Sequence, residues 1–266
     1  MADYEFLKLD RHGAVVSLTL NRPQRRNALT HQMMLELENV FVSIGRDASC
    51  RVLVLRGAGG HFCAGGDLDA MADLPPLPPG GTDPLLPTYR QFGNALIALD
   101  ALPQATIAVV EGSTVGAGFG MVCCSDAVIL RDSARFGIPE PRVGFIPSQI
   151  IPFLVRRMGE GPVRDLAVTG RVIDAAEALR LGVGRYLCTT GAEVEMTLQG
   201  LIDDILKMEP KALAVAKRLV LSCATKDDRT VLDEAAESLV GLLRQPEAAE
   251  GIRHFMAKTT PSWAKR

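Results

Sequence analysis

Residues 105–120 read ATIAVVEGSTVGAGFG, an apolar run of six residues followed by a glycine-rich turn. The apolar run is typical of a strand that is buried on both faces, because it contains no polar side chain to present to water except one threonine. Glycines between such a strand and a following helix let the backbone amides approach a ligand closely. The stretch therefore predicts an α/β fold in which a helix begins within residues 116–120 with unhindered amides.

This turn does not fit either of the common nucleotide-binding motifs. The dinucleotide fingerprint G-x-G-x-x-G would need glycine five positions after Gly116, where the chain has Met121. The phosphate-binding loop would need Gly-Lys followed by Ser or Thr, which the turn does not contain. The amides therefore either face another kind of anion or belong to a plain strand-to-helix turn.

A second segment of the same kind lies earlier in the chain. Residues 61–68 read HFCAGGDL and follow the apolar run RVLVLR of residues 51–56. Two helix starts, each preceded by a buried strand, would direct two backbone amides at one oxygen atom and form an oxyanion hole. The alternative is a tight turn that is capped by the side chain of Asp67.

An oxyanion hole needs a proton donor or acceptor beside it, and Glu140 is the candidate. It ends the segment FGIPE, residues 136–140, and is a single carboxylate in an apolar stretch that proline stiffens. Removal from water raises the pKa of a carboxyl group toward the range in which it can carry protons. The alternative is an ordinary surface glutamate on a loop.

The remaining sequence divides into two parts. Up to about residue 190, short apolar runs alternate with helical patterns; from Gly191 the chain is helical, with breaks near 210, 227 and 246. We predict a strand–helix unit of residues 1–190 and a helical region of residues 191–266 whose apolar faces need a partner surface. Expected strands cover 4–9, 14–20, 51–56, 105–110, 127–130 and 135–136, and an expected helix runs from Thr30 to Ala48. Residues 73–88 contain six prolines and are expected to form a loop that interrupts a helix begun near Asp67.

The bulk composition excludes several classes of protein. The 266 residues carry a net charge of −2 and are 47% apolar, which gives no basic surface for nucleic acid and enough apolar residues for a core. No apolar run approaches the ~18 residues of a membrane span, and the first residues do not resemble a secretory signal, so we expect a cytoplasmic protein. The six cysteines form no C-x-x-C pair, and the four histidines are scattered. We therefore expect reduced thiols, no metal and no cofactor.

Four segments together resemble one family. NRPQRRNAL (21–29), HFCAGGDL (61–68), the glycine-rich run 116–120 and FGIPE (136–140) occur in the order and spacing of the crotonase, or enoyl-CoA hydratase/isomerase, superfamily. The resemblance covers nearly the whole chain. It implies a spiral of ββα units with a C-terminal helical region that forms trimers or hexamers, and a coenzyme A thioester as substrate.

The resemblance also implies roles for individual residues. Glu140 is the implied proton carrier, and the backbone amides of Ala64 and Ala117 are the implied oxyanion donors. Phe255 is implied to reach the CoA of a neighbouring subunit. The full set implied to bind the substrate is Arg25, Arg26, Ala64, Gly65, Gly66, Asp67, Leu68, Gly116, Gly120 and Phe255.

Two departures from the family pattern leave the reaction open. Hydratases with two carboxylates have glutamate where this chain has Gly120, and residues 144–153 (GFIPSQIIPF) are bulkier than the usual glycine-rich turn. The second feature resembles the branch that acts on 3-methylglutaconyl-type thioesters. The favoured prediction is an enoyl-CoA hydratase, a lyase. The alternatives are a Δ3,Δ2-enoyl-CoA isomerase with Glu140 as its single proton shuttle, a methylglutaconyl-type dehydratase acting on CoA or acyl carrier protein thioesters, and a non-catalytic scaffold.

Overall fold

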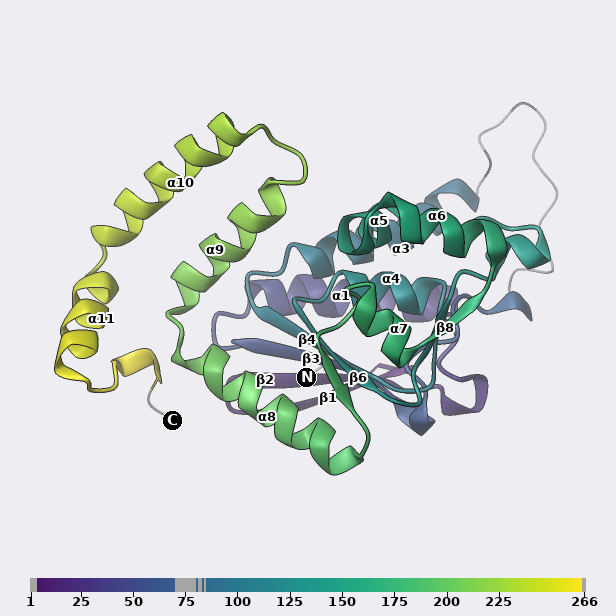
Figure 1. Ribbon diagram of the computed structural model, residues 1–266, viewed down its shortest axis with the longest axis horizontal. Helices are drawn as coiled ribbons and strands as arrows, with labels where there is room; N and C mark the ends of the chain where they lie inside the picture. The colour runs from purple at the N-terminus through teal and green to yellow at the C-terminus, as the bar shows by residue number, and fades with distance from the viewer. Residues whose placement is uncertain (1–3, 70–79, 81–82, 84, 265–266) are drawn as a thin grey trace.

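A computed structural model describes residues 4–69, 80, 83 and 85–264 of the chain (Figure 1). Its centre is a six-stranded sheet in which the first strand is antiparallel to the second and the other neighbours are parallel. In spatial order the strands are β1 (Leu7–His12), β2 (Val15–Leu20), β3 (Val52–Gly57), β4 (Ala105–Val110), β6 (Ala127–Arg131) and β9 (Tyr186–Cys188).

A smaller sheet lies beside the large one and consists of β5 (Ser113–Val115), β7 (Arg135–Gly137) and β8 (Val172–Asp174). Strand β4 leads directly into β5 and β6 into β7, while β3 leads into an extended segment that bridges to β5 through Cys63 and Thr114. The turn from β4 to β5 requires Gly112, which has a φ of +54° and whose Cβ would collide with the carbonyl of Gly60. This repetition of strand, strand and helix is the predicted spiral of ββα units.

Helices cover both faces of the large sheet (Figure 1). Successive residues of a strand face opposite sides, so Ala108 and Val110 join the main core, whereas Ile107 and Val109 pack on α8 in a second core. The helices and short 3-10 turns are η1 (Pro23–Arg25), α1 (His31–Arg46), η2 (Ala58–Gly60), α3 (Leu85–Asp100), α4 (Ala117–Cys123), η3 (Glu140–Val143), α5 (Ile151–Met158), α6 (Glu160–Thr169), α7 (Ala175–Arg180), α8 (Gly191–Lys207), α9 (Pro210–Ser222), α10 (Asp228–Leu243), α11 (Pro246–Ala257) and η4 (Ser262–Ala264).

Helices α9, α10 and α11 extend away from the body of the molecule and are here called the arm, residues 210–257 (Figure 1). None of their residues is buried. Large apolar side chains are exposed along them, namely Val220, Leu232, Leu239, Val240, Leu243, Ile252, Phe255 and Met256. The predicted boundary at residue 191 coincides with the start of α8, but α8 packs on the sheet, so the separation in space comes at Pro210 instead.

Most predicted elements are present, with two corrections. The first strand covers 7–12 rather than 4–9, because the amides of Glu5 and Phe6 donate to the carboxylate of Glu36, both at 3.1 Å, instead of pairing in the sheet. Residues 85–88 belong to α3 rather than to the predicted loop. Pro87 is tolerated there because amides in the first turn of a helix have no intrahelical partner.

The helix cap, the cysteines and the absence of a membrane span were also predicted from the sequence. Thr30 caps α1 as predicted, by accepting from the amide of Met33 at 3.1 Å. Most of the proline-rich segment, and most of the helix expected from Asp67, lie outside the described residues. All six cysteines are free thiols, and five of them are buried. None of the helices in the described part of the chain is both long and apolar enough to span a bilayer.

Candidate active site

A cavity of about 770 Å³ opens where the amino end of α4 meets the segment that follows β3. Glu140 lies in its wall, and the other lining side chains are largely apolar. The lining residues are Met34, Ala64, Gly65, Gly66, Leu68, Leu86, Tyr89, Phe92, Val115, Gly116, Ala117, Pro139, Glu140, Arg142, Val143, Gly144, Phe145, Ile146, Pro147, Ser148, Gln149 and Ile150.

The two glycine-rich segments meet at this cavity, as the sequence predicted. The amide of Cys63 donates to the carbonyl of Ser113, and the amide of Val115 donates to the carbonyl of Cys63, both at 3.0 Å. Beyond this pairing Gly65, with a φ of +91°, passes so close to Val115 that a Cβ there would lie 3.4 Å from the Val115 carbonyl oxygen. Amides from both segments can therefore serve one ligand.

The amide of Ala64, the first predicted oxyanion donor, does not point freely into the cavity. The amide of Ala64 donates to the carbonyl of Arg26 at 2.9 Å, so it already has an acceptor within the protein. The carbonyl of Gly65 accepts from Leu29 at 2.8 Å. In a trans peptide the N–H points opposite to the preceding carbonyl, so the amide of Gly66 points away from Leu29, to the side on which Cys63 pairs with residues 113–115. Gly66, not Ala64, presents the available amide.

The second predicted donor, Ala117, is the first residue of α4 and lines the cavity. Amides in the first turn of a helix have no carbonyl of the same helix to bind, and they carry the positive end of the helix dipole. The preceding residue, Gly116, has a φ of +52°, and a Cβ on it would lie 2.6 Å from Oε1 of Glu140. Glycine at 116 therefore lets the carboxylate approach the beginning of α4.

Glu140 is the only carboxylate among the described residues that line the cavity. Burial raises the pKa of its carboxyl group, an effect that a hydrogen bond from its own backbone amide partly opposes. Its Oε2 atom is buried and has no hydrogen-bond partner within the described structure. A buried carboxylate oxygen without a donor is costly, and such an atom is suited to bind a proton or a reacting group.

Gly120, which the resemblance implied to bind the substrate, is not among the residues that line the cavity. A Cβ on Gly120 would collide with Cγ2 of Ile150 and would lie 3.0 Å from its Cβ and 3.4 Å from Cδ1 of Leu96. The side chain of Ile150 therefore fills the space beside Gly120 and forms the wall itself. The bulky 144–153 segment leaves no room there for a second carboxylate.

Three predicted substrate-binding residues form a polar cluster outside the cavity lining. Asp67 is buried and pairs with Arg22 at 2.6 Å, and it lies 3.8 Å from Arg25, which also pairs with Asp69. Arg26 contributes its backbone: it has a φ of +48°, and its carbonyl holds the amide of Ala64. In this structure these residues fix the segment that carries Gly66.

Asn27 is a structural residue that the sequence analysis missed. It is fully buried with a φ of +58°, its side-chain oxygen accepts from the amide of Arg22 at 2.9 Å, and its nitrogen donates to the carbonyls of Ala58 and His61 at 2.9 and 2.8 Å. It thereby ties residues 21–29 to residues 58–61. An asparagine in a polar loop looks like an ordinary turn residue, so the sequence offered no specific signal for this role.

Phe255 lies in the arm, on α11, and its side chain is 86% exposed. It is not among the residues that line the cavity of its own chain. Of the predicted site residues, the structure therefore brings together seven at the cavity: Ala64, Gly65, Gly66, Leu68, Gly116, Ala117 and Glu140.

Comparisons with known proteins agree with this fold and show the family. The family described as "Enoyl-CoA hydratase/isomerase" matches residues 10–266. A "Putative enoyl-CoA hydratase" of Thermus thermophilus is 30% identical over 252 residues, which are 94% of this chain and 97% of that protein.

Among solved structures, an enoyl-CoA hydratase/isomerase from Marinobacter aquaeolei superposes with a TM-score of 0.94 at 39% identity, covering 98% of this chain and all of the other. Pseudomonas aeruginosa AtuE has a TM-score of 0.92, also at 39% identity and with the same coverage. The chain is an enzyme that belongs to the enoyl-CoA hydratase/isomerase family.

Proposed function

We propose that this enzyme adds water reversibly to an α,β-unsaturated acyl-CoA, with Glu140 as the proton carrier and the amides of Gly66 and Ala117 as donors to the thioester oxygen. The observation that carries the proposal is the buried Oε2 atom of Glu140, which lacks a partner in the described structure and lies in the same cavity as both amides. An acyl-CoA substrate is what the family implies.

The proposed reaction proceeds through an enolate. The oxygen of water bonds to Cβ of the acyl group, Glu140 takes one proton of that water, and the electrons of the double bond move to the thioester oxygen. Glu140 then returns the proton to Cα, and the thioester carbonyl re-forms. The two amides stabilise charge that appears only during the reaction, which is the most effective use of fixed dipoles.

The raised pKa of Glu140 supports this role. A carboxylate with an ordinary pKa is too weak a base to take a proton from water efficiently near neutral pH. Burial moves the pKa of Glu140 upward, toward the pH at which the enzyme works. The same group is then able both to accept a proton and to return it.

A Δ3,Δ2-enoyl-CoA isomerase is the second candidate, and the packing of Ile150 against Gly120 favours it. This contact leaves one carboxylate at the cavity among the described residues. Isomerisation needs only one, because the group that removes a proton from C2 delivers it to C4 while the double bond moves into conjugation. No water molecule has to be positioned.

One experiment separates the two reactions. The purified enzyme is incubated with crotonyl-CoA and, separately, with 3-hexenoyl-CoA, and the absorbance of the conjugated thioester is followed. Loss of absorbance with crotonyl-CoA supports the hydratase, and gain of absorbance with 3-hexenoyl-CoA supports the isomerase. No change with either substrate would contradict both proposals.

We also propose that the arm assembles the chain into trimers or hexamers. The arm has no buried residue, and it exposes large apolar side chains such as Val220, Leu232 and Phe255. Exposed apolar area of this extent is typical of a surface that is covered by a partner. Light scattering at micromolar concentration should give three or six times the 28.6 kDa mass of the chain, and a monomer would contradict the proposal.

A further inference from the structure

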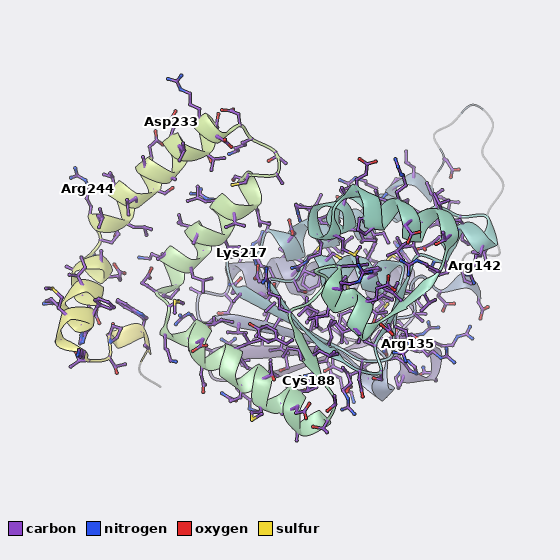
Figure 2. The ribbon with its side chains drawn as sticks, in the orientation of Figure 1. Arg135, Arg142, Cys188, Lys217, Asp233 and Arg244 are labelled. Carbon is purple, nitrogen blue, oxygen red and sulfur yellow. The ribbon has the colours of Figure 1, made fainter. Side chains whose placement is uncertain are left out.

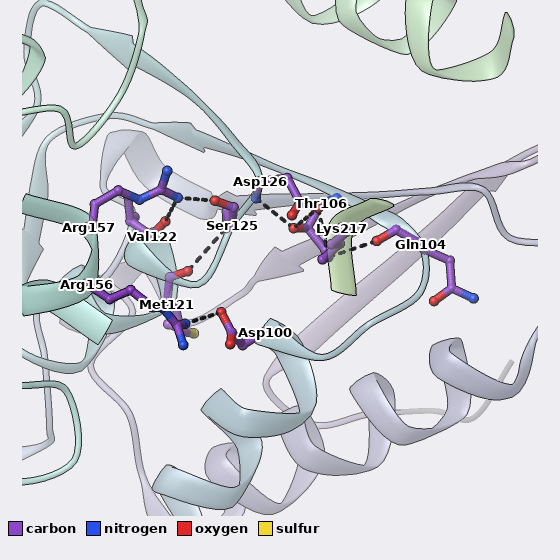
Figure 3. Close-up of polar contacts among 10 residues, drawn as sticks. All are labelled: Asp100, Gln104, Thr106, Met121, Val122, Ser125, Asp126, Arg156, Arg157 and Lys217. Atoms are coloured by element: carbon purple, nitrogen blue, oxygen red, sulfur yellow. Dashed lines mark hydrogen bonds and ion pairs between the residues drawn. The ribbon is translucent and has the colours of Figure 1, made fainter. Parts of the chain in front are cut away.

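A cluster of polar contacts lies at the carboxyl end of α4, and none of its residues is among those that line the cavity (Figure 3). Arg157, in the last turn of α5, donates to the carbonyl of Ser125 and, at 3.5 Å, to the carbonyl of Val122. The hydroxyl of Ser125 donates to the carbonyl of Met121 at 3.1 Å. The carbonyls of Val122 and Met121 also accept from the amides of Ser125 and Cys124, and a cation at this end of a helix is favourable.

In the described part of the chain, the guanidinium of Arg157 donates to these carbonyls and forms no ion pair. Its neighbour Arg156 pairs instead with Asp100 at 2.5 Å, and Asp126 pairs with Lys217 of α9 at 2.8 Å. Figure 3 shows the two arginines of α5 diverging, Arg156 toward Asp100 and Arg157 toward the end of α4. The two side chains therefore have separate tasks although they are adjacent in the sequence.

The helix that Arg157 holds is short and tightly enclosed. Helix α4 has seven residues, or about 10 Å of length, and all of them after Ala117 are buried. Two residues of the 150–157 segment contact it: Ile150, which precedes α5, covers Gly120, and Arg157 of α5 binds the carbonyl of Val122 near the far end and that of Ser125 just beyond it. A rigid element of this length transmits a shift at its carboxyl end to its amino end, where the amide of Ala117 begins the helix.

We propose that Arg157 is a positioning residue for the thioester oxyanion, acting through α4. This inference rests on the proposed function, because it requires the Ala117 amide to bind the thioester oxygen. By fixing the carboxyl end of α4, Arg157 keeps that amide at the correct distance, and its charge has the sign that favours an enolate at the opposite end. Arg157 touches no substrate and is not a catalytic residue.

The matched variants are Arg157→Met, Arg157→Lys and, as control, Arg156→Met. The control removes the adjacent cation of the same helix and unpairs Asp100, but it touches no carbonyl of α4. We expect Arg157→Met to lower kcat by about tenfold with little change in KM, less than the ~10²-fold that a 1 Å misplacement costs. Arg157→Lys should recover part of the loss, because it keeps the charge but not the two-carbonyl contact.

A spectroscopic readout separates positioning from a general loss of structure. Acetoacetyl-CoA bound to the enzyme ionises to an enolate that absorbs in the near ultraviolet, and the oxyanion donors favour that enolate. Its apparent pKa on the enzyme should rise in Arg157→Met and stay at the wild-type value in Arg156→Met. Equal effects of the two methionine variants, or a loss confined to KM or to thermal stability, would overturn the inference.

Only the activity of the wild-type enzyme tests the proposed function. If wild type acts on neither crotonyl-CoA nor 3-hexenoyl-CoA, the proposed function fails, whereas the enolate titration still compares the variants. If wild type is active and Arg157→Met behaves like Arg156→Met, only the role of Arg157 fails.

Discussion

The two segments that bring amides to the cavity do so in different ways. Residues 61–67 are not helical, and alternate backbone groups of this segment bind residues 26–29 on one side and 113–115 on the other. Residues 116–120 instead begin a helix, where the first amides are free because no carbonyl of the helix precedes them. In residues 61–67, hydrogen bonds to distant segments of the chain determine which amide is left without an acceptor. At the start of α4, the position of a residue in the helix determines it.

This difference also determines how each donor is held. The position of Gly66 depends on a loop that Asn27 and the Arg22–Asp67 pair fix from outside the cavity. Arg142, which lines the cavity, is labelled in Figure 2. The position of the Ala117 amide depends on α4, where Ile150 packs against Gly120 and Arg157 binds the carbonyl of Ser125 just beyond the helix. One proposed donor is positioned by polar contacts to a loop, and the other by the contacts of Ile150 and Arg157 with α4 and the residues that follow it.

The largest effect is expected at Glu140, which both segments surround. Glu140→Gln keeps the shape of the side chain but removes the proposed proton carrier, so kcat should fall by ~10²–10⁴-fold while the fold is retained. Turnover of the true substrate is measured together with circular dichroism. Activity close to that of the wild type would remove Glu140 from the mechanism and leave the two amides without a proton carrier.

The next effect tests which amide of residues 61–67 is used. Gly66→Pro deletes the amide that points away from Leu29, and loss of one oxyanion donor costs ~10²–10³-fold in kcat. Ala64→Pro deletes instead the amide that binds the Arg26 carbonyl, so it should mainly lower stability, by about 1 kcal/mol for one hydrogen bond. Steady-state kinetics and thermal melts of both variants give the comparison.

Because proline also restricts the backbone, a gentler replacement is the control. Replacing the amide by an ester at position 66 or at position 64 removes the N–H without a ring. The assignment of Gly66 fails if the ester at 64 lowers kcat and the ester at 66 does not. Binding of a saturated acyl-CoA, measured by calorimetry, shows in each case whether the substrate still enters the cavity.

The same comparison shows what was accessible from the sequence. The strands, α1, the helical C-terminal region and the convergence of the two glycine-rich segments follow from periodicity and from glycine placement, which are local signals. Ala117 as the start of a helix is also local. The exchange of Gly66 for Ala64 was not predictable in this way, because it depends on pairing with Arg26 and Leu29, more than thirty residues earlier in the chain.

Two other features were hidden for a related reason. The sequence shows that Gly120 lacks a carboxylate, but only the packing shows that Ile150, thirty residues later, occupies the space. The extension of the arm away from the body is likewise not visible in the amphipathic pattern of α9–α11, which requires a partner surface without specifying where it lies.

A smaller effect compares the glycines of the two segments. Gly116→Ala places a side chain in left-handed backbone and 2.6 Å from Oε1 of Glu140, so the carboxylate must move, and kcat should fall by roughly tenfold. Gly65→Ala imposes similar backbone strain of ~1–3 kcal/mol, but its Cβ meets the carbonyl of Val115 at 3.4 Å and not Glu140. Both variants should have a lower melting temperature, but only Gly116→Ala should also show a large loss of kcat. Equal losses of kcat would show that Glu140 is not confined by Gly116.

The smallest expected effect is on the pH dependence of folding stability. It is measured on the same variant, Glu140→Gln. Folding raises the pKa of Glu140 because its ionised form is buried, so the folded state favours the protonated group. The stability gained from this group is complete below the pKa of the unfolded chain, about 4.3, and is lost as the pH rises through the higher pKa of the folded state. Glutamine is neutral at every pH and does not lose this stability.

The melting temperature of Glu140→Gln should therefore match the wild type near pH 4 and exceed it increasingly toward neutral pH. Glu160→Gln, which changes an exposed glutamate paired with Arg164 on α6, controls for the loss of a surface charge. A melting-temperature difference for Glu140→Gln that stays constant with pH, or that grows on acidification, would mean that Glu140 is not held in a site unfavourable to its charge. The carboxylate would then need another source for its basicity.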